Sequence, residues 1–215
     1  MRASLGKCKW LTCPAAEEPV PLYDRAMVPE APLEQTEAGL VAAGHGWFVL
    51  NAREARWRHR EGRGEVLSFT GTTDVEVETY FPHLGVNLAV LGPGEPMSMY
   101  HWEGDPEGFL VLAGEALLIV EGEERRLVQW DFVHCPPGTQ HVIVGAGEAR
   151  CAVLAVGARE HLDSKVGVAW GAYTVDEAAL RHGVGVEEET TDSKQAYGRF
   201  ADPEPTRYQD GWLPG

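Results

Sequence analysis

The sequence has no long apolar run, and nothing near its beginning is typical of a signal peptide. The longest apolar segments, residues 109–113 and 116–120, are far shorter than the roughly 20 residues of a membrane-spanning helix. Prolines from Pro14 onward stand where a signal peptide has its apolar segment. We therefore expect a cytoplasmic protein that does not bind membranes, with Met27 as an alternative first residue.

Cationic side chains are also scarce. The 215 residues carry 18 Lys and Arg against 33 Asp and Glu, a formal net charge of −15. Binding to nucleic acid needs cations that displace counterions from phosphates, so we expect no nucleic acid as a partner. The one basic stretch, residues 53–63, contains five arginines. It fits either a phosphate site or, as we favour, a solvated turn or a patch that faces an acidic partner subunit.

The four cysteines are too few for a disulfide scaffold. Cys8 and Cys13 have no second Cys/His pair nearby, which argues against a zinc knuckle. We expect Cys135 and Cys151 to be small buried side chains on strands, and we expect a structural role for His134.

Three regions differ in their patterns. Residues 1–45 are rich in proline and predict an N-terminal arm. In residues 46–160, an apolar run at 47–50 predicts a buried strand, and Gly-containing turns then separate short segments rich in Val, Leu, Ile and Phe. This spacing predicts an all-β fold, an antiparallel barrel or jelly roll.

Residues 161–215 predict a tail that is partly helical and partly extended. Thr174 and Glu177 have the spacing of a capping box, so a short helix should follow and stop near Gly183. A weaker second helix should begin at Asp192. Apolar side chains near the end predict that this segment docks on the rest of the protein; they are Tyr208, Trp212 and Leu213.

Side chains that can hold a metal ion gather at two places in the barrel region. His101 and Glu103 share one face of a strand, because alternate residues of a strand point the same way. Glu107 follows a Gly-Asp-Pro turn, and His141 follows a tight turn at residues 136–138. We expect these four side chains to meet on adjacent strands of one sheet. Two imidazoles and two carboxylates suit a divalent transition metal, which also offsets the burial of two like charges.

At these residues the sequence resembles the cupin superfamily, over residues 84–156. The first cupin motif has His-x-His, three or four residues, Glu, six residues and Gly. His101, Glu107 and Gly114 match it, and Glu103 stands in place of the second His. The second motif has Pro-x-Gly followed two residues later by His, which the turn at 136–138 and His141 match.

The resemblance implies a small β-barrel or jelly roll, often dimeric, with one metal ion inside. It implies that His101, Glu107 and His141 are metal ligands and that Glu103 is a fourth; otherwise Glu103 is an acid in the pocket wall. The sequence departs from the motifs elsewhere too. Trp130 stands at the leading Gly of the second motif and Gly145 at its Asn, and Gly94 lies one residue early.

Strand alternation predicts which side chains line the site. Those expected to point inward beside the ligands are Met97, Met99, Phe109, Val111 and Ile143. Those expected to point outward, toward the arms or a second subunit, are Tyr100, Trp102 and Trp130. No general base can be identified from the sequence; the candidates near the site in sequence are Tyr80, His83 and Asn87.

These observations favour a metal-dependent enzyme that acts on a small molecule, of dioxygenase, isomerase or decarboxylase type, with Fe, Mn, Zn or Ni in the barrel. The alternative is a non-catalytic protein that binds or senses a small ligand through the metal, and a third hypothesis is a metal-free barrel used for assembly. Because a barrel of this size has sheet edges that must be covered, we also expect a homodimer.

Overall fold

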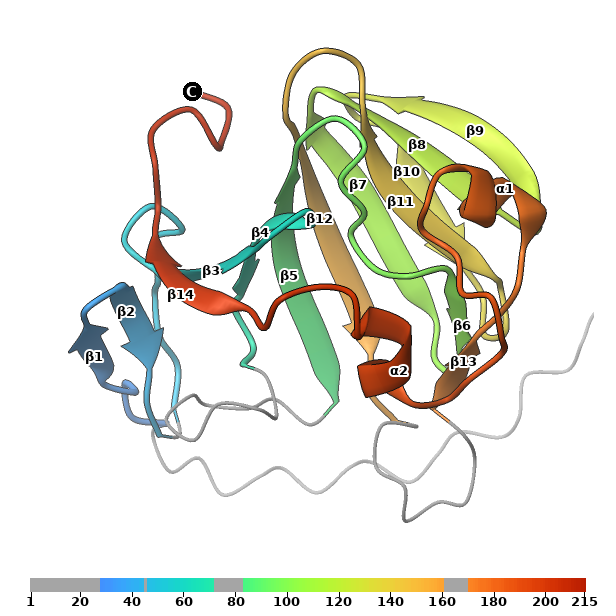
Figure 1. The fold of residues 1–215 in the computed structure, drawn as a ribbon. Helices are drawn as coiled ribbons and strands as arrows, with labels where there is room; N and C mark the ends of the chain where they lie inside the picture. Colours follow the sequence, from blue (N-terminus) through green and yellow to red (C-terminus); the bar gives the residue numbers. More distant parts are fainter. Residues whose placement is uncertain (1–27, 45, 72–82, 161–169) are drawn as a thin grey trace, which may run out of the picture.

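Three antiparallel sheets, two of them large, and two short helices make up the protein in the computed structural model (Figure 1), which describes residues 28–44, 46–71, 83–160 and 170–215. The predicted all-β class is confirmed. None of the helices in this part of the chain has the length and apolar character that a membrane crossing needs.

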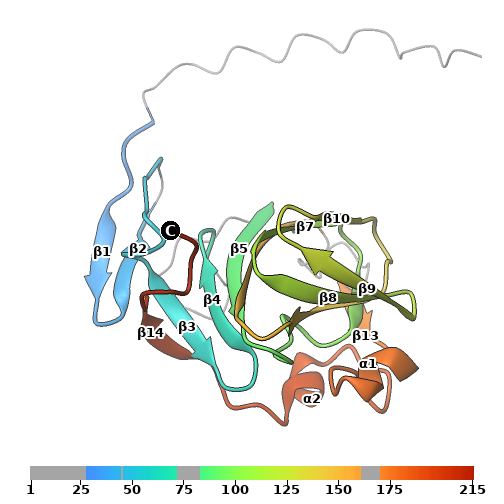
Figure 2. The same ribbon diagram turned by 90° about the horizontal axis from the view of Figure 1, so that it is seen from above.

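One large sheet has seven strands and the other five. The order in the larger sheet is β10 (Phe132–Cys135), β7 (Glu107–Ala113), β12 (Cys151–Ala158), β5 (Leu84–Leu91), β4 (Gly64–Ser68), β3 (Arg56–Arg60) and β14 (Glu204–Arg207). The order in the smaller sheet is β13 (Gly171–Tyr173), β6 (His101–Glu103), β11 (His141–Ala146), β8 (Glu115–Val120) and β9 (Glu123–Val128). Seen from above, β5, β7, β8 and β10 curve around a common interior, whereas β3 and β14 extend the larger sheet to one side (Figure 2).

The main core fills the space between the sheets. Along β7, Phe109 and Val111 point into this core, while Leu112 packs on the opposite side of the sheet. The same alternation places the side chain of Glu107 inside the barrel. Cys135 and Cys151 are buried in this core, as predicted.

The N-terminal region contains more structure than an arm without regular elements. Strands β1 (Leu33–Thr36) and β2 (Gly39–Ala42) form a separate two-stranded sheet beside β3 (Figure 2). Residues 47–50, in contrast, form no strand, and the side chain of Val49 is 78% exposed, so the prediction of a buried strand there is wrong. An apolar run alone does not supply the neighbouring strand that a buried strand needs.

Both predicted helices are present. Helix α1 (Glu177–Arg181) ends before Gly183 as expected, but its N-cap is Asp176, which accepts a hydrogen bond from the backbone N–H of Ala179 at 2.8 Å. Thr174 does not cap the helix because its hydroxyl instead donates to the side chain of Gln140. Helix α2 (Ser193–Tyr197) begins after Asp192, as the sequence predicts.

The C-terminal segment covers the edges of both sheets. Strand β13 pairs with β6, and β14 pairs with β3. The predicted docking of the chain end is confirmed, because Trp212 packs edge-on against the buried Trp57 with ring centroids 5.3 Å apart. Tyr100 points outward as predicted and is covered by α1, through Ala178 and Ala179.

Candidate metal site

His101 and His141 are cross-strand partners on β6 and β11, and their ring centroids lie 5.0 Å apart. The turn before β11 explains this pairing. Gly138 adopts a positive φ of 84°, and its N–H donates to the carbonyl of Glu103 at 2.8 Å. A glycine at this turn therefore ties the start of β11 to the end of β6 and brings the two imidazoles together.

Glu107 reaches the histidines from the facing sheet. It lies on β7 in the seven-stranded sheet, whereas His101 and His141 lie in the five-stranded one. The expectation that all the ligands come from one sheet is therefore wrong, since the turn after Glu103 carries the chain across the barrel. One ligand atom from each of the three side chains lies within 4.8 Å of the others.

Hydrogen bonds orient both imidazole rings. The Nδ1 atom of His101 lies 2.8 Å from the carbonyl oxygen of Met99, and Nδ1 of His141 lies 3.0 Å from that of Thr139. A carbonyl only accepts, so in each ring Nδ1 carries the hydrogen and donates it. The Nε2 atom is then left to bind a cation, the usual arrangement of a metal-binding histidine.

The side chain of His141 faces a buried carboxylate oxygen of Glu107. Nε2 of His141 lies 3.2 Å from Oε2 of Glu107, and this buried oxygen has no hydrogen-bond partner. Burial lowers the pKa of His141, but its contacts with the side chains of Cys135 and Glu107 raise it to about 10. Either a proton or a metal ion must therefore separate the nitrogen and oxygen lone pairs. The buried, unpartnered oxygen and the donor set fit a divalent transition metal.

Glu103 stands apart from this three-residue group. Its Oε1 atom lies 3.3 Å from Nε2 of His101, but its carboxylate is not among the atoms that lie within 4.8 Å of one another. Its side chain is partly exposed and lines the same cavity. That Glu103 is a fourth ligand stays a prediction.

The group lies in a cavity of about 210 Å³ inside the barrel. Of the side chains predicted to line it, Met97, Phe109 and Ile143 do so. Met99 instead packs against Tyr173 beside α2, because the chain before β6 is not a strand and does not alternate. Val111 points inward but lies in the packed core rather than in the cavity wall.

Several side chains in the cavity wall were not predicted. Trp170, Tyr173 and Tyr197 come from the C-terminal segment, and Arg60 comes from β3. The rings of Trp170 and Tyr173 pack edge-on with centroids 5.3 Å apart, but nothing in the sequence showed where this segment docks. Arg60 also departs from the predicted solvated turn, because only 8% of it is exposed.

Of the candidate general bases, Asn87 lines the cavity, His83 is exposed at the start of β5, and Tyr80 lies outside the described residues, as do Cys8, Cys13 and Met27. His134 is exposed on β10.

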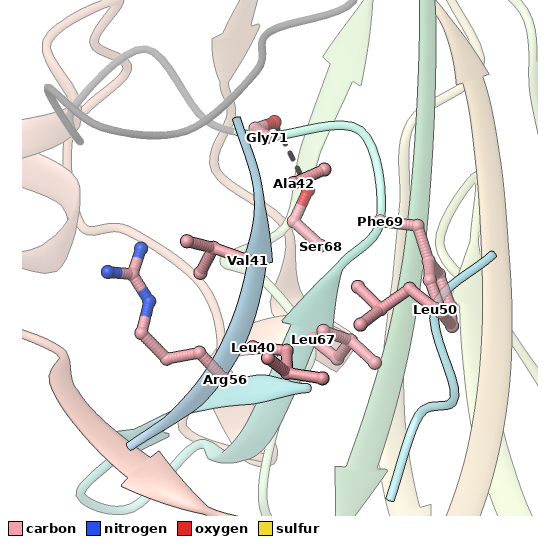
Figure 3. A pocket seen from close by; sticks show the side chains of 9 residues that line it. All are labelled: Leu40, Val41, Ala42, Leu50, Arg56, Leu67, Ser68, Phe69 and Gly71. Atoms are coloured by element: carbon pink, nitrogen blue, oxygen red, sulfur yellow. Dashed lines mark hydrogen bonds between the residues drawn. The ribbon is translucent and has the colours of Figure 1, made fainter. Parts of the chain in front are cut away.

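A second hollow lies between β2 and β4 (Figure 3). Its walls are mainly apolar, with Arg56 and Ser68 among them, and its volume of about 20 Å³ has room for little more than a water molecule. It is too small to be a ligand site.

Residues 87–157 match the family model of the cupin domain. This part of the chain is a cupin domain. The match contains β6, β7 and β11, and thus all three side chains of the metal-binding group. Arg60, Trp170, Tyr173 and Tyr197 lie outside the cupin domain, although they line the same cavity.

Solved structures similar to this chain include two sugar phosphate isomerases by name. The one from Silicibacter pomeroyi, of the cupin superfamily, is 27% identical over 47% of this chain and 62% of that chain, with a TM-score of 0.40. A candidate sugar phosphate isomerase from Acidithiobacillus ferrooxidans is 28% identical over 37% of this chain and 52% of that one, with a TM-score of 0.35. The chain thus spans less than two thirds of either relative.

A Cupin 2 conserved barrel domain protein from Salinispora arenicola is 23% identical, over 43% of this chain and 72% of that chain, with a TM-score of 0.35. No curated protein is significantly similar to this sequence.

Proposed function

We propose that this protein is a metal-dependent enzyme that acts on a small molecule, with Fe, Mn, Zn or Ni bound by His101, Glu107 and His141. The observation that carries the proposal is the convergence of three ligand atoms within 4.8 Å, one of them a buried carboxylate oxygen with no hydrogen-bond partner. Three protein ligands leave coordination positions open, as catalytic metal sites require, whereas structural zinc sites use four.

A bound metal would polarise a substrate carbonyl or, as Fe(II), activate oxygen, and the protein's own side chains supply the rest. The carbonyls of Met99 and Thr139 hold the two imidazoles in orientation. Phe109 and Ile143 give the cavity an apolar wall that limits the entry of water. Glu103 lines the cavity beside His101, so if it does not bind the metal, its carboxylate can accept or return a proton of the substrate.

Elemental analysis of protein purified without oxygen tests the metal site. We expect stoichiometric metal in the wild type and in the control His134→Ala, which removes an exposed histidine. His101→Ala and His141→Ala should each lose the metal, because neither leaves two imidazoles in the group. Stoichiometric metal in both variants would refute this metal site.

Turnover separates an enzyme from the non-catalytic alternative. Oxygen consumption by the Fe-loaded protein on addition of a small acid or thiol would identify an oxygenase, and conversion of such compounds without oxygen would indicate isomerase or decarboxylase chemistry. Ligand binding without turnover in either assay would favour the binding or sensing protein instead.

A homodimer stays a prediction, as does a cytoplasmic location. Exposed apolar side chains support the homodimer, since Trp130 in the turn between β9 and β10 and Phe132 on β10 are each 67% exposed. A sedimentation mass near 23.5 kDa at micromolar concentration would contradict it.

A further inference from the structure

Two arginine side chains lie close together at the cavity. Arg60 lines the cavity and donates hydrogen bonds to the carbonyls of Met97, at 3.0 Å, and Arg63, at 2.8 Å. Arg63 donates to the same Met97 carbonyl at 3.1 Å and stacks on Tyr197, with its guanidinium carbon 4.1 Å from the ring centroid. Because one carbonyl accepts from both guanidinium groups, two positive charges lie side by side.

No carboxylate of the described residues pairs with either arginine. The two acids that act on Arg60 electrostatically have partners elsewhere: Glu65 pairs with Arg150 and His59, and Glu95 accepts a hydrogen bond from the N–H of Gly92 at 2.6 Å. The Nε atoms of Arg60 and Arg63 are buried and have no hydrogen-bond partner. A buried guanidinium without an anion is unfavourable, because burial removes its water and the carbonyls of Met97 and Arg63 replace only part of the lost interaction.

Arg60 is nevertheless a cation at neutral pH. Burial first, and then the charge of Arg63, lower the pKa of Arg60 to about 9, which still leaves it protonated. The cavity also contains two carboxylates, Glu103 and Glu107. Once a divalent ion is bound, the positive charge of the ion and Arg60 exceeds the negative charge of these carboxylates, so the cavity as a whole attracts an anion.

We propose that the cavity binds a small organic anion, a carboxylate or a phosphate ester, whose anionic group pairs with Arg60 while its reacting end reaches the metal. This inference rests on the metal site proposed above. A guanidinium suits either anion because its planar set of N–H donors matches two oxygens at once. The ligand must be small, since about 210 Å³ lies below the roughly 300–1,000 Å³ of pockets for drug-sized molecules.

Calorimetric titration of the Mn(II)-loaded protein tests the proposal with two pairs of probes. Pyruvate is compared with its uncharged methyl ester, and glycerol 3-phosphate with glycerol. We expect one of the two anions to bind at least about tenfold more tightly than its neutral counterpart, as one charge-assisted hydrogen-bond pair provides. The anion that binds identifies the ligand as a carboxylate or a phosphate ester.

Substitution of Arg60 assigns the binding to this side chain. Arg60→Met should weaken binding of that anion at least about tenfold, and Arg60→Lys should restore part of it, because the charge returns without the planar set of donors. Arg125→Met removes an exposed arginine on β9 and should change the affinity less than about twofold, since solvent and salt screen exposed charges. Metal content and thermal unfolding of each variant show whether the site and the fold are intact.

The outcomes separate this inference from the metal site. If wild-type protein holds stoichiometric metal but binds neither anion more tightly than its neutral counterpart, the inference is wrong and the metal site stands. Equal anion affinity in folded, metal-loaded wild type and Arg60→Met would also overturn it. Wild-type protein that binds no metal would refute the metal site and, with it, this inference.

Discussion

The cavity is built by two parts of the chain that differ in how they reach it. The candidate metal ligands lie within the cupin domain, on strands that bring them together, such as His101 opposite His141. The other wall contains Arg60 from β3 and aromatic side chains from the C-terminal segment, which reach the cavity only when those segments dock. We therefore expect that substitutions in the docked segments change ligand binding without removing the metal.

The largest expected effect is a loss of metal affinity when a carboxylate near the candidate metal site is replaced. Glu107→Gln should reduce metal affinity by more than about 100-fold, beyond the 10–100-fold of outer-shell residues, because it removes an anionic ligand and the charge that balances the ion. Glu103→Gln should cost less than about tenfold if Glu103 lies outside the coordination shell. Competition with a metal-sensitive dye measures the metal affinity of both variants. Equal losses of affinity would indicate that Glu103 binds the metal as Glu107 does.

Removal of the Trp212 side chain tests whether the docked chain end contributes to stability without affecting the metal site. Trp212→Ala should lower the free energy of unfolding by about 2 kcal/mol, somewhat less than a fully buried tryptophan, because its ring packs on Trp57 at the edge of the cluster. Metal content should not change. Chemical denaturation measures the loss, with the half-exposed Trp47→Ala as the control that should remain near the wild type. A loss of metal in Trp212→Ala would show that the two parts are coupled.

A smaller change affects the wall alone. The hydroxyl of Tyr197 accepts a hydrogen bond from the backbone N–H of Met99 at 3.1 Å, so Tyr197→Phe should cost about 1 kcal/mol of stability. Anion affinity should fall a few-fold while metal content stays unchanged, since Tyr197 lines the cavity without belonging to the metal-binding group. Titration with the anion and elemental analysis are applied to Tyr197→Phe and to Tyr208→Phe, a control outside the cavity wall. A loss of metal in Tyr197→Phe would contradict the prediction.

The smallest effect concerns a turn of the cupin domain that does not line the cavity. Trp130 adopts a φ of 76°, a conformation that favours glycine, and it stands where the second cupin motif has its leading Gly. Trp130→Gly should therefore raise the free energy of unfolding by up to about 1 kcal/mol, because relief of this strain outweighs the added flexibility of the unfolded chain. Trp130→Ala keeps the strain and serves as the control. Thermal unfolding measures both, and a gain in the alanine variant alone would exclude backbone strain as the cause.

The spacing of a few residues, together with the resemblance to cupins, predicted that the candidate ligands His101, Glu107 and His141 lie together. A Gly-Asp-Pro turn separates His101 from Glu107. The turn before His141 contains Gly138, whose φ of 84° is one that favours glycine. The same reasoning placed the ligands on one sheet, because a sequence does not show whether a turn leads to the next strand or to the facing sheet. It also chose Thr174 as a helix cap, although Asp176 competes for that position and Gln140 engages the Thr174 hydroxyl.

The sequence alone predicted the all-β class of the barrel and the three side chains that converge in it, His101, Glu107 and His141, because these depend on local periodicity and on short turns. Only the tertiary structure decided that Arg60 faces the cavity rather than solvent, and that Trp170, Tyr173 and Tyr197 complete its wall. Alternation along a strand tells which side chains share a face, but which face is covered depends on segments that are distant along the chain.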